Sequence, residues 1–137
     1  MLQKEVAQRL TAAVGSKEYG ILSVLLGACA SVETLLTVGP EQFHPRPKVD
    51  SVVVKITFQP QTRTDYDNHL LVKIVKTGFQ NRRKTLINCL ANSSHIDLSK
   101  QLAVQALESA GIPPKARGET LTIDDYIRLT NIIQPML

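Results

Sequence analysis

Alternating apolar residues indicate one well-defined strand in the first half of the chain. The run from 51 to 58 alternates as expected when successive side chains point to opposite faces of a sheet. One face would carry Val52, Val54, Ile56 and Phe58. A second apolar run, at 32–38, predicts a partner strand. The dozen residues between the two runs suit an antiparallel pair joined by an ordered loop.

Two helices are predicted ahead of this strand pair. Residues 1–13 place Leu2, Val6 and Leu10 on one stripe, which is typical of an amphipathic helix. No Ser, Thr, Asp or Asn precedes this helix to cap it, so we expect the sequence to begin within a structural element. The nearly continuous apolar run at 21–30 predicts a buried helix.

The second half of the chain is predicted to be helical. Apolar residues recur at helical spacing through 66–92, which predicts one long helix. A second helix is expected at 99–110, where a glycine and then two prolines end the pattern. A third is expected at 122–133, because Thr122 and Asp125 have the spacing of a capping box.

A polar segment separates these two halves. Residues 59–65 lack apolar periodicity and include Pro60. We therefore expect two domains, at 1–61 and 62–137. The predicted fold class is α+β, with helices and an antiparallel strand pair followed by a small all-helical domain.

Positive charge is concentrated in the predicted helix 66–92. The chain has 16 Lys and Arg against 12 Asp and Glu, a net charge of +4. This helix has five cations and one acid, Asp67, so it carries as much net charge as the whole chain. The cations are Lys73, Lys76, Arg82, Arg83 and Lys84. Solvated helix faces usually mix both signs, so the pattern favours phosphate contact over an ordinary solvated face.

Two residues do not fit a helical wheel drawn through 66–92. Arg82 falls on the apolar side, and Ile87 falls in the middle of the cationic face. Arginine is rarely buried without a partner. We therefore expect either a distortion near Gly78 or an acidic partner for Arg82.

The loop expected between the two strands combines an aromatic side chain, prolines and cations. Phe43 is followed by Pro45 and Pro47, which restrict the backbone, and by Arg46 and Lys48. A rigid aromatic beside cations is suited to hold an unstacked nucleobase and its phosphates. The alternative is an ordinary connection in which Phe43 fills the core.

The sequence gives little support for a metal site, a nucleotide-binding loop or a membrane segment. Cys29 and Cys89 form no CxxC motif and lie in apolar stretches, so both are expected to be buried, reduced thiols. The three histidines are dispersed, which argues against a metal site. No phosphate-binding P-loop, signal peptide or membrane-spanning run is present in this sequence. These features predict a cytoplasmic protein without a membrane or metal partner.

Five motifs together resemble one enzyme family along nearly the whole chain. They are Gln3–Leu10, Ser16–Val24, Phe43–Ser51, Arg82–Leu86 and Arg117–Leu121. In this order they are similar to the small-subunit ribosomal RNA adenine N6-dimethyltransferases. That family joins a Rossmann-like domain, which binds S-adenosylmethionine, to a small helical domain. It dimethylates two adjacent adenosines near the 3′ end of small-subunit rRNA.

The resemblance implies roles for specific residues. Phe43 matches the aromatic that stacks on the flipped target adenine. Arg46, Lys48 and the 82–84 cations match positions expected to meet rRNA, and we assign Lys73 and Lys76 to the same surface. The chain departs from the family at Gly27-Ala28-Cys29, where aromatics are usual, and at Ile87, where arginine is frequent.

Only the second half of the family pattern is present. The Gly-rich cofactor loop, the acidic ribose-binding residue and the Asn-Leu-Pro-Tyr type motif are missing from this sequence. The resemblance thus implies the C-terminal remnant of a Rossmann-like methyltransferase sheet. We expect S-adenosylmethionine to serve the full-length enzyme but not to bind this portion, which alone would be inactive.

Two alternative functions remain open. One is a non-catalytic RNA-binding or ribosome-assembly module. The other is a relative that methylates adenine in large-subunit rRNA and shares the aromatic-Pro-x-Pro loop. The continuation Lys48–Ser51 and the Arg82–Leu86 motif favour the small-subunit branch. The expected partner is therefore an immature small ribosomal subunit, bound by a monomer.

Overall fold

The computed structural model describes residues 1–59 and 65–137. Contacts divide the chain into two compact units, Met1–Gln61 and Thr62–Leu137. The boundary expected from the sequence, between residues 61 and 62, lies outside the described residues. Each unit is therefore described by itself.

The first unit contains a three-stranded antiparallel sheet in the order β1-β3-β2. The strands are β1 (Leu2–Gln3), β2 (Ala30–Val38) and β3 (Ser51–Phe58). The sequence prediction of a strand at 51–58 and of an antiparallel partner is confirmed, although β2 begins two residues before the predicted 32. The expected α+β class, with a helical second part, is also confirmed.

The N-terminal helix is shorter than its apolar stripe predicts. Leu2 and Gln3 form β1, which pairs with Val52 and Ser51 of β3. The backbone N–H of Lys4 then donates to the Asp50 carbonyl at 3.0 Å. The predicted helix at 1–13 is therefore wrong at both ends, and α1 spans Lys4–Leu10. Backbone pairing with a distant strand outweighs the local helical pattern of these residues.

The second helix, α2 (Ile21–Gly27), is only partly buried. The sequence predicts a buried helix at 21–30, but residues 30 onward belong to β2 and the side chain of Leu22 is 49% exposed. Ser23 and Val24 are the residues that α2 buries. The Ser23 hydroxyl donates to the carbonyl of Arg9 and accepts from the Gly20 N–H, which ties α2 to α1.

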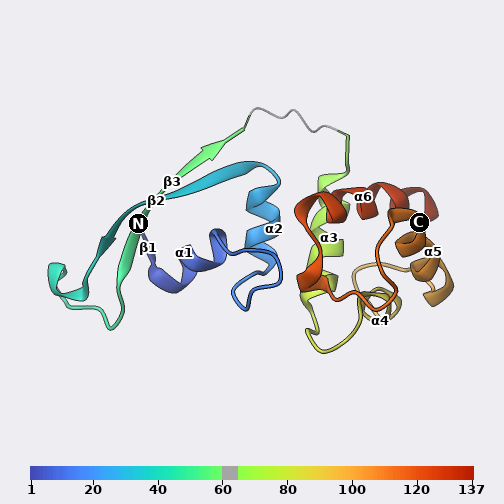
Figure 1. Ribbon diagram of the computed structural model, residues 1–137, viewed down its shortest axis with the longest axis horizontal. Helices are drawn as coiled ribbons and strands as arrows, with labels where there is room; N and C mark the ends of the chain where they lie inside the picture. The colour runs from blue at the N-terminus through green and yellow to red at the C-terminus, as the bar shows by residue number, and fades with distance from the viewer. Residues whose placement is uncertain (60–64) are drawn as a thin grey trace. The chain divides into compact units, whose positions relative to one another are not determined.

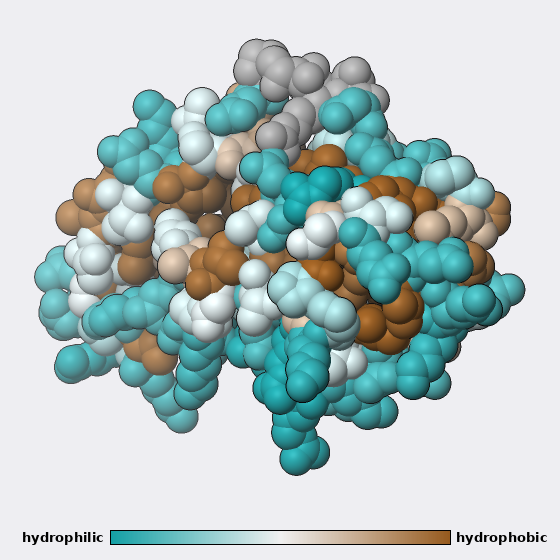
Figure 2. Space-filling view, turned by 45° about the vertical axis from the view of Figure 1, so that its right-hand side comes forward, coloured by the Kyte–Doolittle hydropathy of each residue, from teal (hydrophilic) through white to brown (hydrophobic). Residues whose placement is uncertain are grey.

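The helices cover only part of the sheet. α1 contacts β2 and β3, and α2 contacts β2 (Figure 1). Val52 is buried, whereas Phe58, at the end of the same predicted apolar face, is 67% exposed. Leu35 and Leu36 of β2 are also more than half exposed. Hydrophobic residues therefore reach the molecular surface, as the brown areas of Figure 2 illustrate on one face.

In the second unit, the described residues 65–137 form a bundle of four helices and two short 3-10 turns. Its helices are α3 (Asn68–Phe79), α4 (Leu86–Ala91), α5 (Lys100–Ala110) and α6 (Ile123–Ile133), and its turns are η2 (Gly118–Thr120) and η3 (Gln134–Met136). α3 and α5 each contact α4 and α6 (Figure 1). The core is formed by fully buried side chains, including Ile74, Val75, Leu86, Leu90, Leu107, Tyr126, Leu129 and Ile133.

The caps of the last two long helices agree with the sequence. The Ser99 hydroxyl accepts from the Leu102 N–H at the start of α5, and Gly111 ends that helix with a φ of 71°. The Thr122 N–H donates to the Asp125 carboxylate at 3.0 Å, and the Asp125 N–H donates to the Thr122 hydroxyl at 3.1 Å. The predicted capping box is confirmed.

The predicted long helix at 66–92 is wrong, because two helices with a turn between them occupy this region. The Asn81 side-chain oxygen accepts the Arg83 N–H at 3.2 Å, and Thr85 caps α4 by accepting from the Asn88 N–H. The Leu86 N–H donates at 2.8 Å to the carbonyl of Ala116, which is distant in sequence and lies outside the helices. Local side-chain bonds and one long-range backbone bond thus end α3 and restart the chain as α4.

This break removes both anomalies of the helical wheel. Ile87 is only 8% exposed, because α4 has its own orientation and buries the side that the continuous wheel assigned to solvent. Arg82 lies in the turn and is exposed, instead of projecting into an apolar core. The cations predicted on one helix face are therefore divided between α3 and the turn that follows it.

Candidate nucleic-acid interface

The loop between β2 and β3 presents an accessible aromatic ring with cations after it. It begins with the 3-10 turn η1 (Pro40–Gln42), and the Phe43 N–H donates to the Pro40 carbonyl at 3.2 Å. Phe43 is half-buried and is absent from the buried core. This partial exposure disfavours the alternative in which the ring fills the core.

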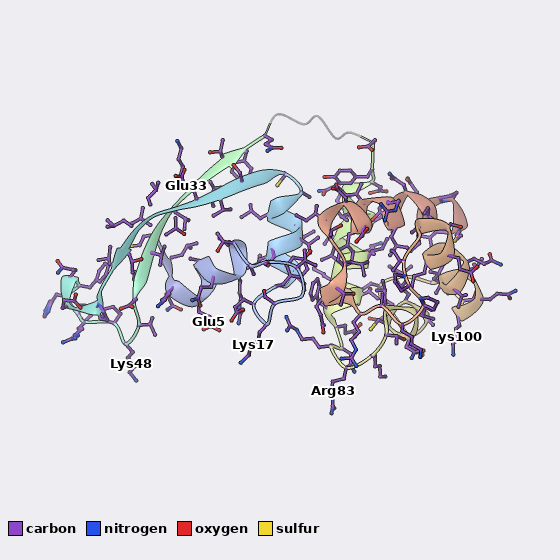
Figure 3. The ribbon with its side chains drawn as sticks, in the orientation of Figure 1. Glu5, Lys17, Glu33, Lys48, Arg83 and Lys100 are labelled. Atoms are coloured by element: carbon purple, nitrogen blue, oxygen red, sulfur yellow. The ribbon has the colours of Figure 1, made fainter. Side chains whose placement is uncertain are left out.

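The two cations of this loop point into solvent. Arg46 and Lys48 are exposed, and neither forms an ion pair with any residue in the described parts of the chain. Figure 3 shows Lys48 projecting away from the strands, and Figure 1 shows the loop at the end of the β2–β3 pair opposite α2. One loop thus supplies a half-buried ring and two unpaired positive charges.

A second group of cations lies on α3 and in the turn 80–85. Lys73 and Lys76 are exposed on adjacent turns of α3. Arg82, Arg83 and Lys84 are exposed in consecutive positions of the turn. Figure 3 shows Arg83 projecting away from the helices of its unit. Within residues 1–59 and 65–137, the side chains of Lys73, Lys76, Arg83 and Lys84 have no acidic partner.

A close approach of two backbones holds this turn. An added Cβ at Gly118 would overlap the carbonyl oxygen of Gly78, and one at Gly78 would lie 2.7 Å from the Tyr126 hydroxyl. That hydroxyl donates to the Gly118 carbonyl at 2.6 Å, while the Tyr126 ring stacks on Phe79 with centroids 6.1 Å apart. The Arg117–Leu121 motif therefore has a structural basis in Gly118, which the sequence alone did not reveal.

A polar pocket lies beside the same turn. Its volume is about 210 Å³, and its lining comprises Gln80, Asn81, Lys84, Asn88, Cys89 and Asn92. Sequence reasoning missed this pocket because a continuous helix would place Asn81, Lys84, Asn88 and Asn92 along one side of its surface, with no hollow between them. The available signal was the density of amide side chains between 80 and 92.

The two cysteines differ in accessibility, which corrects the expectation that both are buried. Cys29 is exposed, whereas Cys89 is buried. Burial raises the pKa of the Cys89 thiol, and a hydrogen bond to the Asn81 backbone and the charge of Lys84 offset this only in part. A raised pKa leaves less of the reactive thiolate at neutral pH.

We therefore predict that a thiol-alkylating reagent labels Cys29 before Cys89. Labelling of Cys89 should accelerate as the pH is raised toward the pKa of its thiol, because the thiolate is the reacting form. Mass spectrometry of the two cysteine-containing peptides over time gives both rates. Equal rates at neutral pH would contradict this assignment.

Neither a metal cluster nor a membrane-spanning helix is found in the part of the chain that the structure describes. In those residues, no three His, Cys, Asp or Glu side chains gather in a way that could hold a metal ion. None of the described helices has the length and apolar character needed to cross a bilayer.

Comparisons with known proteins agree with the five motifs. The sequence model described as "Ribosomal RNA adenine dimethylase" matches residues 1–135. The chain is 40% identical to a ribosomal RNA small subunit methyltransferase A from Desulfotalea psychrophila, covering 98% of this chain and 48% of the relative. It is 44% identical to the same-named protein from Alkaliphilus metalliredigens, covering 95% of this chain and 45% of that protein.

Solved structures show the same fold. A dimethyladenosine transferase from Plasmodium falciparum matches with a TM-score of 0.83 and 22% identity, over 97% of this chain and 55% of that one. The 23S rRNA methyltransferase ErmE matches with a TM-score of 0.55 and 20% identity, over 95% of this chain and 51% of that one. The chain spans about half the length of the curated relatives it matches. With its family resemblance confirmed along nearly its whole length, the chain belongs to the ribosomal RNA adenine dimethylase family.

Proposed function

We propose that this chain is part of an S-adenosylmethionine-dependent rRNA adenine N6,N6-dimethyltransferase. The enzyme would act on adjacent adenosines near the 3′ end of small-subunit rRNA, in the cytoplasm and as a monomer. Residues 1–61 would form part of the catalytic domain and residues 62–137 an RNA-binding domain. The observation that carries the proposal is the exposed turn in which Arg83 and Lys84 have no acidic partner among the described residues.

The residues of this chain do not fit a site for S-adenosylmethionine. Sites of that type use a glycine-rich turn between a strand and a helix. Among the described residues, β2 leads through Gly39 and Pro40 into a single 3-10 turn, and β1 leads directly into α1 without a glycine. The cofactor, which supplies a methyl group on a sulfonium, would bind to residues outside this sequence. We infer that this chain alone does not transfer methyl groups.

The contribution of the first unit would be to hold the target base outside the RNA stack. Methylation of an exocyclic amine requires that the base leave its helix, which costs unstacking energy. The half-buried ring of Phe43 offers a stacking surface that recovers part of this cost. Arg46 and Lys48, exposed in the same loop, would neutralise phosphates on either side of the flipped nucleotide.

The contribution of the second unit would be to bind the rRNA backbone. Lys73 and Lys76 on α3 and the cations of the 82–84 turn are exposed in one compact unit. Lys73, Lys76, Arg83 and Lys84 have no acidic partner among the described residues, and binding of such cations to phosphates releases counterions from the RNA, so affinity falls steeply with salt. The Gly78–Gly118 approach fixes the end of α3 from which this turn departs.

Replacing Arg83 and Lys84 together by alanine is expected to flatten the salt dependence of binding to small-subunit rRNA. Each lost phosphate contact reduces the slope of log K against log salt by about 0.7 to 0.9, so two contacts reduce it by roughly 1.4 to 1.8. Titration of labelled rRNA at several salt concentrations measures the slope.

The matched control for this variant is Lys17→Ala with Lys100→Ala. It removes the same charge from two exposed lysines outside the 82–84 turn and should leave the slope closer to that of the wild type. If the Arg83 and Lys84 variant kept the wild-type slope, the turn would not bind phosphate and the RNA-binding role would be refuted.

A further inference from the structure

Amide residues predominate in the lining of the pocket beside the 80–85 turn. Four of its six lining residues are asparagine or glutamine, and a lysine stands among them. The side chains of Gln80, Asn88 and Lys84 have no hydrogen-bond or ionic partner among the described residues. The pocket therefore presents free donors and acceptors together with one free positive charge.

The size of the pocket restricts what it can hold. Its volume of about 210 Å³ lies below the roughly 300 to 1,000 Å³ of sites for drug-sized ligands. It has no aromatic lining residue, so a ligand cannot be held there by stacking. No acidic residue lines it either, which disfavours a metal ion or a cationic ligand. A small, planar, polar group next to an anion is the best match.

An unpaired nucleobase with its phosphate has this chemistry. Asparagine and glutamine amides donate and accept at once, and so form paired hydrogen bonds with the polar edge of a base. Proteins read single-stranded RNA through such edges when the bases are splayed out. Lys84, which belongs both to the pocket and to the cationic turn, could contact the phosphate of the same nucleotide.

We propose that this pocket binds one unpaired base of RNA through its hydrogen-bonding edge, with Gln80 and Asn88 reading the base and Lys84 holding its phosphate. The proposal rests on the proposed function in taking RNA as the ligand. It adds a second recognition point, in the helical unit, to the base that would stack on Phe43. The helical unit would then select its RNA by sequence or local unpairing as well as by charge.

The test compares two short, unstructured oligoribonucleotides of equal length and charge, one with bases and one abasic. The parent protein is the full chain carrying Phe43→Leu, so that stacking at the first unit does not contribute. The pocket variant adds Gln80→Met and Asn88→Leu, which keep side-chain size and charge but remove both amides. The matched control adds Gln105→Met and Asn131→Leu, which change exposed residues of α5 and α6.

We expect the parent and the matched control to bind the base-bearing oligomer about tenfold more tightly than the abasic one. The pocket variant should lose this preference but keep its affinity for the abasic oligomer and its salt slope, because no charge changes. Far-UV circular dichroism checks that each variant remains folded. In the parent, the side-chain amide NMR signals of Asn88 should shift with the base-bearing oligomer and not with the abasic one.

Two results would overturn the proposal. The first is a pocket variant that still prefers the base-bearing oligomer as strongly as its parent. The second is an Asn88 side-chain amide signal that shifts equally with the base-bearing and the abasic oligomer. If the cationic turn nevertheless shows its predicted salt dependence, only the pocket is refuted. If the chain binds neither the oligomers nor rRNA, both the pocket proposal and the proposed RNA-binding function are refuted.

Discussion

Replacement of Gly118 by alanine is expected to destabilise the second unit by about 3 kcal/mol or more, a loss typical of overpacking against a backbone that cannot move. The new methyl group would overlap the carbonyl of Gly78 and lie 3.0 Å from the Tyr126 hydroxyl. Relief would require α3 and η2 to separate. That movement would break the hydrogen bond from Tyr126 to the Gly118 carbonyl, which is buried.

Denaturant unfolding combined with hydrogen exchange of the α5 and α6 amides would measure this loss in the second unit. Gly111→Ala is the matched control in the same unit, since Gly111 has a φ of 71° and no atom within 4 Å of an added Cβ. It should cost only about 1 kcal/mol, the conformational penalty of a left-handed backbone for alanine. If Gly118→Ala lowered the free energy of unfolding no more than Gly111→Ala, the backbones at Gly78 and Gly118 would not be in close contact.

Replacement of Phe43 by leucine is expected to weaken binding of unpaired, base-bearing RNA by about 1 to 3 kcal/mol, the contribution of one base stacked on an aromatic ring. By the usual conversion this is roughly a 5- to 150-fold loss of affinity. Leucine keeps an apolar side chain for the half-buried part of the site but has no π face. Binding of an abasic oligomer of equal charge should be unchanged, because Arg46 and Lys48 remain.

Two further variants make this prediction specific. Phe43→Tyr should restore most of the lost affinity, since tyrosine keeps the aromatic ring. Phe58→Leu is the matched control, because Phe58 is the more exposed phenylalanine of the same unit at 67% and lies at the far end of β3 from the loop. Fluorescence anisotropy measures the affinity of each variant for the base-bearing and the abasic oligomer. Equal losses for Phe58→Leu and Phe43→Leu would argue against a dedicated stacking role for Phe43.

The structure changes how the cationic surface of the second unit is understood. A single amphipathic helix would place Lys73, Lys76, Arg83 and Lys84 on one straight face and Arg82 on the opposite, apolar side. In the structure, three consecutive cations instead project from a turn held by Asn81 and by the Leu86–Ala116 backbone bond. A turn can present adjacent residues on one side, which a helix cannot do at a spacing of 100° per residue. The break at 80–85 also creates the pocket.

Local chemistry explains which elements could be predicted. The alternation at 51–58, the helix end at Gly111 and the capping box at Thr122 involve residues close together in the chain, and the structure has all of them. The failures occurred where distant residues compete with the local pattern. Helical periodicity continues across the turn because α3 and α4 both bury apolar side chains in the same core. The apolar periodicity therefore predicts one helix, and only the misfits at Arg82 and Ile87 indicate the break.

The amino-acid sequence by itself determined the family, through five ordered motifs, and also the strand pair, the capped helices and the concentration of charge in residues 66–92. Only the tertiary structure decided that Leu2 and Gln3 form a strand, that α3 ends before the cations at 82–84, and that Gly118 must lack a side chain. The amide pocket likewise exists only once the chain has folded. The physical reason is that these features depend on contacts with residues remote in sequence, whose free energy outweighs the small local preferences that a pattern records.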